Sequence, residues 1–534
     1  MPYYLLLASL IVILCVAGNR LSGRLGVPAL FLFIALGMLF GSDGLFRIPF
    51  DNYVFAEQIC SVALIFIMFY GGFGTNWRAA RPVAARAALL SSLGTVLTAV
   101  LTGVFCYFAL RFPLLESFLI GAVISSTDAA SVFAILRGKK LNLRDGTASL
   151  LEVESGSNDP FSYMLTVVLL SFMGGGEDVS IPLLLAKQVA FGLLGGILTA
   201  ALALFVLRYL KFVTAEMSAV FIFAIAVLSY ALPAVCGGNG YLSAYLAGIL
   251  LGNRPLKHKV LVVHFFDGIT NLAQILIFFL LGLLAFPSQL PHLLLPAVLI
   301  ALFLTFVARP VAVFAILSPF RCPVRQQLLV SWAGLRGAAS IVFAIMVTVS
   351  EAFTDNDIFH IVFCIVLLSI AFQGTLLPLV ARKLRMVDDG SNVLRTFNDY
   401  QEESQVQFIQ LRIPSDDHPW AGRTLQEIAL PPDTLLALIR RDGKSIVPHG
   451  RTRLRAGDLV VLSAPRFEDG QDIRLQEMTI DSSHPWAGKA LRELDLPPGA
   501  LVVMIRRETG SIVPRGRTQI RPGDVLVLNG YEEI

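Results

Sequence analysis

The chain has 534 residues, of which 55% are hydrophobic and only 15% are charged, and its mean hydropathy is +0.71. Soluble globular proteins carry about 25% charged residues, so this composition excludes a purely soluble protein and indicates one that lies largely in a membrane. The net charge of +4 comes from basic loops between apolar segments, so it does not indicate a nucleic-acid partner.

Apolar stretches dominate the chain up to residue 386. A bilayer core of ~30 Å requires about 20 apolar residues in each helix. The first stretch has no basic start and no small-residue cleavage site, so we expect a retained helix rather than a signal peptide. We predict a polytopic α-helical membrane protein with about 13 transmembrane helices, at approximately 3–20, 28–42, 54–72, 86–111, 115–137, 148–174, 184–211, 215–235, 240–252, 257–286, 292–318, 325–350 and 357–380.

Arginine and lysine gather in alternate loops between these stretches. Loops that carry positive charge stay in the cytoplasm, so the basic side is predicted to be cytoplasmic. An odd number of spans then places the N-terminus outside and the C-terminal tail in the cytoplasm. The basic loops lie at 20–24, 78–86, 137–144, 208–211, 254–259, 321–325 and 382–385.

Polar and charged residues interrupt three of the later stretches. The fifth contains "ISSTDAASVFAIL", with Thr127 and Asp128, the eleventh contains Arg309, and the twelfth contains "WAGLRGAASIVFAI", with Arg336. Such breaks in apolar helices are typical of discontinuous, crossed helices in transporters built from inverted repeats. The small residues also favour close helix packing, but packing does not explain the charges.

The sixth stretch opens with "LLEVESGSNDPFS" and carries three acids. Asp159 lies about eleven residues into it, or ~16 Å deep, where a lone charge costs several kcal/mol. Glu152, Ser155 and Asp159 share one helical stripe, and Glu154 and Asn158 are i,i+4 neighbours. The acids are therefore expected to face the protein interior or a water-filled cavity. The alternative is a buried salt bridge that only locks helices together.

The chain becomes polar after Arg385. We predict a transmembrane domain at 1–386, a linker at 387–404, and small domains at 405–466 and 472–534. The segment "HPWAGRTLQEIALPP" at 418–432 returns as "HPWAGKALRELDLPP" at 484–498, and the segment at 439–462 returns at 505–528 without a gap. Each copy reads as a short helix followed by strands. The tail is therefore predicted to be two α+β modules in tandem, related by a pseudo-twofold.

The membrane part resembles the monovalent cation:proton antiporter family 1, the NhaP-type sodium or potassium/proton exchangers. The resemblance rests on the E-x-E-S-x-x-N-D run at 152–159, the Thr-Asp pair of the fifth stretch, the "GLRGA" run at 334–338 and "FFDGITNLAQILIFFLLGLL" at 265–284. It implies a homodimer in a bacterial plasma membrane. Relatives often have an acid where this chain has Tyr70, so a cation contact at that position is in doubt.

The same resemblance implies a role for each residue of the motif. Asp159 binds the cation or protons, and Thr127, Asp128 and Ser155 supply further oxygens. Asn158 stands where electrogenic relatives have a second Asp, so exchange is expected to be electroneutral. The resemblance also implies a structural ion pair between Glu154 and Arg336, with Arg309 close to the site and balancing its charge.

The tail resembles two RCK C-terminal (TrkA-C-like) domains. Such domains regulate potassium channels and transporters, and in some relatives the pair binds cyclic di-AMP. The arginine pairs Arg440–Arg441 and Arg506–Arg507 suit a phosphate ligand, although solvated strand-end arginines are an equal interpretation. No other cofactor and no resident metal is expected, because the sequence shows no metal-ligand cluster.

Together these features predict an antiporter that exchanges cytoplasmic K⁺ or Na⁺ for H⁺ and that the tail regulates. K⁺ is favoured over a Na⁺-selective antiporter because such tails accompany potassium transport. A tail-gated K⁺ channel needs a filter such as TVGYG, and "GGFGT" at 71–75 lacks that pattern. A sensor with a transporter fold is the third hypothesis. No enzyme motif is present, since "ESGSN" is not a G-x-S-x-G elbow.

Overall fold

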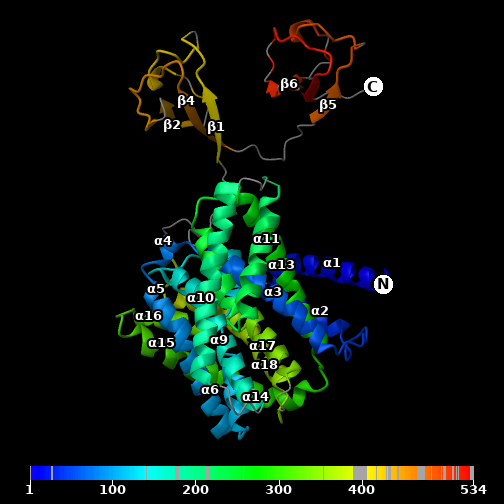
Figure 1. Cartoon of the computed structure of the whole chain (residues 1–534), viewed down its shortest axis with the longest axis vertical. Coiled ribbons are helices and arrows are strands. Elements are labelled where there is room, and N and C mark those ends of the chain that lie inside the picture. Colours follow the sequence, from blue (N-terminus) through cyan, green and yellow to red (C-terminus); the bar gives the residue numbers. More distant parts are fainter. Residues whose placement is uncertain are drawn as a thin grey trace. The chain divides into compact units, whose positions relative to one another are not determined.

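The computed structural model describes residues 2–388, 406–465 and 475–529, with short gaps at 26–27, 140, 175–179, 211–213, 215, 257, 351, 353, 417, 429, 431–433, 442–443, 483, 495, 497–500, 508–509, 513 and 515. The chain forms two compact units, Met1–Gln401 and Glu402–Ile534. Helices build the first unit and strands the second (Figure 1). Nearly all of the predicted linker at 387–404 lies outside the described residues.

The first unit is a helical bundle (Figure 1). Its α-helices are α1 (Pro2–Leu25), α2 (Ala29–Phe40), α3 (Tyr53–Gly74), α4 (Trp77–Ala80), α5 (Ala84–Leu89), α6 (Thr95–Ala109), α7 (Leu114–Val123), α8 (Ala129–Gly138), α9 (Thr147–Met173), α10 (Ile181–Phe205), α11 (Ser218–Val235), α12 (Gly240–Gly252), α13 (Lys259–Leu284), α14 (Leu290–Phe303), α15 (Arg309–Leu317), α16 (Val324–Trp332), α17 (Ala338–Val349), α18 (Ile358–Leu368) and α19 (Thr375–Lys383). Short π-helices join some of them, namely η1 (Leu90–Gly94), η2 (Val206–Leu210), η3 (Leu304–Ala308) and η4 (Ser369–Gly374).

Each predicted apolar stretch falls on one described helix or on consecutive helices, with ends that differ by a few residues. Seven helical segments of the described chain are long and apolar enough to cross a membrane, namely Tyr53–Gly74, Ala84–Ala109, Ile181–Leu210, Ser218–Val235, Lys259–Leu284, Leu290–Leu317 and Ile358–Lys383. Five shorter apolar helices accompany them. A total of 13 spans, related by inverted repeats, stays a prediction.

Two of the predicted spans are broken in the middle, as the polar interruptions predicted. The chain is not helical between α7 and α8, over residues 125–128, and again between α16 and α17, over 334–337. The Asp128 N–H donates to the Leu335 carbonyl at 2.8 Å, so the two non-helical segments touch. Serine, threonine and aspartate favour such breaks because their side chains compete for backbone hydrogen bonds.

Close packing between helices depends on small residues. A Cβ atom added to Gly72 of α3 would lie 2.1 Å from the Tyr245 carbonyl oxygen of α12, and one added to Gly248 of α12 would lie 2.1 Å from the Phe69 carbonyl oxygen. Only glycine permits this approach of two helix backbones, which is the packing that lipid-embedded bundles favour. The α3–α12 contact supports one wall of the cavity described below.

Each tail module is a four-stranded antiparallel sheet. The first sheet has the order β1-β4-β2-β3 and the second β5-β8-β6-β7, so the repeat in sequence is a repeat in topology. The strands are β1 (Val406–Arg412), β2 (Leu435–Arg441), β3 (Lys444–Ile446), β4 (Leu459–Pro465), β5 (Leu475–Thr479), β6 (Leu501–Arg507), β7 (Gly510–Ile512) and β8 (Val525–Asn529).

The short helix expected in each module is a single 3₁₀ turn. These turns are η5 (Leu425–Glu427) and η6 (Leu491–Glu493). The Trp-Ala-Gly turn precedes each one, and its Gly422 or Gly488 has a φ of 75° or 83°. Glycine adopts this left-handed conformation without a steric penalty, which explains the repeated motif. How the modules pair stays a prediction.

Candidate functional site

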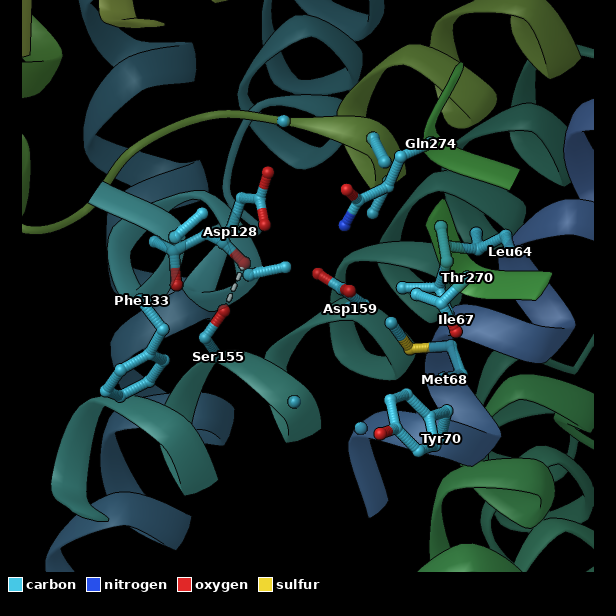
Figure 2. A pocket seen from close by; sticks show the side chains of 18 of the residues that line it. Leu64, Ile67, Met68, Tyr70, Asp128, Phe133, Ser155, Asp159, Thr270 and Gln274 are labelled. Carbon is cyan, nitrogen blue, oxygen red and sulfur yellow. Dashed lines mark hydrogen bonds between the residues drawn. The ribbon is translucent and has the colours of Figure 1, made fainter. Parts of the chain in front are cut away.

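The acidic segment of α9 meets the non-helical segment before α8. Asn158 Nδ2 donates to Thr127 Oγ1 at 2.6 Å, and the Thr127 N–H donates to Asn158 Oδ1 at 3.3 Å. Ser155 Oγ donates to the Thr127 carbonyl at 2.5 Å (Figure 2, dashed line). These contacts bring three predicted site residues together. They also give Asn158 and Ser155 a structural task, because a broken helix leaves backbone groups that need partners.

A cavity of about 320 Å³ opens beside this contact, and Asp159 lies in its wall. Figure 2 shows the Asp159 carboxylate between Asp128 and Ser155 on one side and Met68, Tyr70 and Thr270 on the other. Asp159 is buried, and among the described residues its Oδ1 atom has no hydrogen-bond partner. A buried polar atom without a partner is costly, so this oxygen is suited to bind a proton or a cation.

Asp128 lines the same cavity but has a different environment. Its Oδ1 accepts a hydrogen bond from the Ser131 N–H at 3.1 Å, and its Oδ2 accepts one from the Ser131 hydroxyl at 2.5 Å. Asp128 therefore caps the N-terminus of α8, a position that stabilises a negative charge. Of the two aspartates, Asp159 is the one with an oxygen left over.

The predicted ion pair between Glu154 and Arg336 is wrong in its choice of arginine. Arg309 Nη2 donates to both Glu154 carboxylate oxygens at 2.9 Å, and both side chains are almost fully buried. Arg309 directly follows the π-helix η3, and such bulges often mark functional sites. Arg309 is therefore the ion-pair partner of Glu154. This corrects the expectation that Arg309 only balances the charge of the site.

Arg336 binds backbone instead. Its Nη1 donates to the carbonyls of Ser125 and Ser126 at 2.8 and 2.6 Å. Those carbonyls lie where the helix is broken, and a guanidinium is rich in donors. The neighbouring Gly337 is needed for the same crossing, because a Cβ there would lie 2.0 Å from Asp128 Oδ2. Arg336 and Gly337 therefore hold the two broken helices together.

The sequence prediction missed Asp267 and underestimated Tyr70. The Tyr70 hydroxyl of α3 donates a hydrogen bond to Asp267 Oδ1 of α13, and both residues line the cavity. Glu152, Thr270, Asn271 and Gln274 line it too. An acid within an apolar span is a functional candidate by itself, so the argument that selected Asp159 also applied to "FFDG" at 265–268. Tyr70 stands where the resemblance led us to expect an acid, and it holds the carboxylate of Asp267 by a hydrogen bond.

The four tail arginines divide into two kinds. Arg441 donates from Nε and Nη2 to the two carboxylate oxygens of buried Asp458, each at 2.7 Å. Arg507 repeats this bond to Asp524 at 2.6 and 2.9 Å. These two arginines are structural, which corrects the expectation that both members of each pair face a ligand. Arg440 and Arg506 have exposed side chains.

The environment of the two tail aspartates favours their charged forms. Burial by itself would raise the pKa of Asp458, but hydrogen bonds from Arg441 and from the Arg455 N–H outweigh burial and hold the pKa below its usual value. Asp524 is held below its usual pKa in the same way, by Arg507 and the Arg521 N–H. A carboxylate stabilised by an arginine and a backbone donor is expected to behave so.

A buried carboxylate in a cavity beside two broken helices is typical of a secondary transporter. The family described as sodium/hydrogen exchanger, transmembrane, matches residues 9–383, and the TrkA-C domain matches residues 408–466 and 475–533. The chain therefore belongs to the sodium/hydrogen exchanger family of multi-pass membrane antiporters and carries two TrkA-C domains. The predicted resemblance is confirmed, and membership of an antiporter family leaves no support for the channel hypothesis.

Among the relatives, the K⁺/H⁺ antiporter NhaP of Alkalimonas amylolytica is 34% identical over 86% of this chain and 80% of its own length. The K⁺/H⁺ antiporter NhaP2 of Shewanella baltica is 33% identical over the same shares. The solved sodium proton antiporter MjNhaP1 of Methanocaldococcus jannaschii matches 72% of this chain and 99% of its own chain, with a TM-score of 0.64 and 24% identity. That likeness concerns the fold.

Proposed function

We propose that this protein exchanges an alkali cation for protons by competition at Asp159. The observation that carries the proposal is the unpartnered Oδ1 of Asp159, buried in the wall of the cavity. A proton and a cation both satisfy such an oxygen, so the binding of one displaces the other. Thr127, Asp128 and Ser155 line the same cavity and supply further oxygens to the cation. Asn158 was expected at the same site, but it does not line this cavity and binds Thr127 instead.

The test is proton flux in proteoliposomes that contain the purified full chain. Asp159→Asn keeps the shape of the side chain and removes its charge, so we expect a folded protein whose exchange falls to the background of empty liposomes. Asp43→Asn is the matched control, because Asp43 binds the Ser288 N–H away from the cavity. Exchange by Asp159→Asn at the wild-type rate would refute the assignment.

The proposed cation is K⁺, and the alternative is a Na⁺-selective antiporter. Two relatives with more than 30% identity over most of the chain are named K⁺/H⁺ antiporters. The experiment compares K⁺, Na⁺, Li⁺ and Rb⁺ at equal concentration against the same proton gradient. Exchange that is fastest with K⁺ and Rb⁺ supports the proposal, and exchange confined to Na⁺ and Li⁺ supports the alternative. The proposed direction in the cell is export of the cation from the cytoplasm.

Exchange is proposed to be electroneutral, with one cation per proton. Glu154 is neutralised by Arg309, Asn158 carries no charge, and Asp128 is held by Ser131. Asp267 and Glu152 also line the cavity, and we propose that each keeps one charge state through the cycle, so that Asp159 is the acid that alternates between proton and cation. A membrane potential imposed by a gradient of a permeant anion should therefore leave the rate unchanged at fixed K⁺ and H⁺ gradients. A rate that follows the potential would indicate a second proton carrier, with Asp128 as the candidate.

The proposed topology has 13 spans in two inverted repeats, with the N-terminus outside and the tail in the cytoplasm of a bacterium. The alternation of basic loops supports this orientation. The contact between the two broken helices supports the repeats, since α7–α8 and α16–α17 break in corresponding ways. The homodimer also stays part of this proposal. Labelling of single cysteines introduced into successive loops by an impermeant reagent tests the orientation.

The tail is proposed to regulate exchange through an anionic ligand such as cyclic di-AMP. Arg440 and Arg506 occupy corresponding strand ends in the two modules and are exposed. A ligand shifts the transporter only by its different affinities for two arrangements of the tail. Calorimetry of the fragment 400–534 with cyclic di-AMP tests binding, and Arg440→Gln with Arg506→Gln should abolish the heat. Removal of the tail should keep exchange but change its pH or ligand dependence.

A further inference from the structure

Three arginines surround a recess outside the transport cavity. The recess has a volume of about 520 Å³, and Leu141, Arg144, Arg382, Arg385 and Val387 line it. It lies where the connection between α8 and α9 meets the end of α19. The Arg144 N–H donates to the Met386 carbonyl and the Asp388 N–H donates to the Asn142 carbonyl, both at 2.9 Å. Two separate parts of the chain are thus fixed around the recess.

The three guanidinium groups have no assigned protein partner. Their side chains are exposed, and within the described part of the chain none of them forms a hydrogen bond or an ion pair. Two acids lie close by in sequence, Asp145 and Asp388, and neither lines the recess. Guanidinium groups bind phosphate oxygens through paired N–H donors, and three of them line this one recess. The recess therefore suits an anion with several oxygens.

An apolar stripe leads along the last span to this recess. Phe372, Leu376 and Leu379 are exposed by 64%, 39% and 50%, and they lie at i, i+4 and i+7 before Arg382. Residues at this spacing share one face of a helix. A phospholipid has the same arrangement, with apolar acyl chains next to a phosphate group. The stripe favours a phosphate that belongs to a lipid over a free phosphate in solution.

We propose that the recess binds the phosphate of an anionic phospholipid in the leaflet at the C-terminal end of α19. Arg144, Arg382 and Arg385 bind the phosphate oxygens, and the stripe at 372–379 contacts an acyl chain. The bound lipid clamps the α8–α9 connection to the end of α19. Since α8 begins beside Asp128 and α9 carries Asp159, the lipid composition of the membrane acts on the segment that joins both. This proposal does not depend on the chemistry at Asp159.

Arg385 permits a test that separates binding from folding. Its φ is +54°, a left-handed conformation that glycine adopts more readily than arginine. Arg385→Gly therefore removes a guanidinium and relieves the backbone, so the protein should be at least as stable as the wild type. Arg321→Gly is the matched control, because Arg321 has a φ of +54° and the same helix-end hydrogen bond, but does not line the recess.

The experiment titrates the purified full chain in detergent with phosphatidylglycerol, with phosphatidylcholine and with inorganic phosphate, and follows the midpoint of thermal unfolding. Phosphatidylglycerol should raise the midpoint of the wild type and of Arg321→Gly equally. Arg385→Gly should need about fivefold more phosphatidylglycerol for the same rise in the midpoint, because this is the usual contribution of one arginine at an anionic surface. The triple variant Arg144→Gln, Arg382→Gln, Arg385→Gly should need more still.

Each other outcome overturns the proposal. Equal protection of the wild type and the triple variant means that the lipid binds elsewhere. Equal protection by phosphatidylcholine means that only the apolar stripe binds, and equal protection by inorganic phosphate means that the ligand is a soluble phosphate. Proton exchange in liposomes of phosphatidylcholine alone remains the separate test of Asp159, so failure of one proposal is distinct from failure of the other.

Discussion

The membrane domain and the tail modules are each centred on an arginine that binds a buried carboxylate, but the two kinds of pair differ in their exposure to water. Glu154 and Arg309 are exposed by only 1% and 2%. In the tail, Asp458 is fully buried while Arg441 keeps 20% of its side-chain surface exposed. Breaking an ion pair costs less free energy when one of its groups stays partly hydrated. Breaking the membrane pair is therefore expected to lower the stability of the protein more than breaking a tail pair.

The two pairs also leave different groups available for function. In the membrane domain, the ion pair neutralises Glu154, while Oδ1 of Asp159 has no hydrogen-bond partner among the described residues. In the tail, the ion pair occupies Arg441 and Arg507 and leaves their neighbours Arg440 and Arg506 exposed. In both regions, an arginine–carboxylate pair occupies one charged group, and the neighbouring charged group lies outside the pair. This comparison leads to four predictions, from the largest expected effect to the smallest.

Breaking the membrane pair should have the largest effect. Glu154→Gln leaves Arg309 charged and unpaired inside the protein, which costs about 3–5 kcal/mol. The measurement is the yield of monodisperse protein and its midpoint of thermal unfolding in detergent. The double variant Glu154→Gln, Arg309→Gln should be more stable than Glu154→Gln alone, because no charge is left behind. If the loss of stability in the double variant equalled the sum of the losses in the two single variants, Glu154 and Arg309 would not be energetically coupled.

Breaking a tail pair should cost less. Arg441→Gln removes a bidentate bond to Asp458, but Asp458 keeps its hydrogen bond from the Arg455 N–H, so the stability of the first module is expected to fall by about 2 kcal/mol. Arg507→Gln should have the same effect on the second module, since the two networks are alike. Urea unfolding of the isolated tail, residues 402–534, measures both. Arg440→Gln, one residue earlier on the same strand, is the control and should unfold like the wild type.

The tail should lose stability in acid through these same pairs. The pKa values of Asp458 and Asp524 are held below their usual value in the folded tail, while the unfolded chain protonates them near pH 4. Their stabilisation is therefore complete at neutral pH and is lost as the pH falls below about 4 through the folded-state pKa. The unfolding midpoint of Asp458→Asn should change less over this range than that of the wild type. An equal change in both would exclude the aspartate as the source.

The smallest effect is expected where a carboxylate is held by a neutral donor. Tyr70→Phe removes the hydrogen bond to Asp267. It breaks no ion pair, because the tyrosine hydroxyl is neutral. Asp267 then loses its fixed position in the cavity, so the apparent KM for the cation should rise about fivefold at an unchanged maximal rate. Tyr107→Phe, an exposed tyrosine, serves as the control. An unchanged KM would limit the Tyr70–Asp267 bond to a structural role.

The comparison also explains why one site assignment failed. Arg309 and Arg336 both stand in apolar stretches beside small residues or proline, so their local sequences do not distinguish their partners. The break before α8 exposes the carbonyls of Ser125 and Ser126, and Arg336 binds them. Arg309, which follows a π-helix, is then the arginine that reaches Glu154. Both decisions depend on contacts between helices that are distant in the chain.

The sequence by itself determined the features that arise from short-range patterns. These are the apolar stretches that became helices, the breaks at 125–128 and 334–337, the family, and the two repeated tail modules with their Trp-Ala-Gly turns. Periodicity, turn residues and motif spacing act over a few residues, so they are visible in the chain. The hypothesis that Asp159 is the exchanging acid also comes from the sequence, because an acid in the middle of an apolar helix is costly unless it has a function.

The tertiary structure alone decided which charged groups meet. It paired Glu154 with Arg309, placed Asp267 against Tyr70, and bound Arg441 and Arg507 to aspartates of their own modules. An ion pair or a hydrogen bond forms only within a few ångströms, and whether two side chains reach that distance depends on the depth and rotation of the elements that carry them. Those quantities are fixed by packing across the whole domain, which no local pattern records.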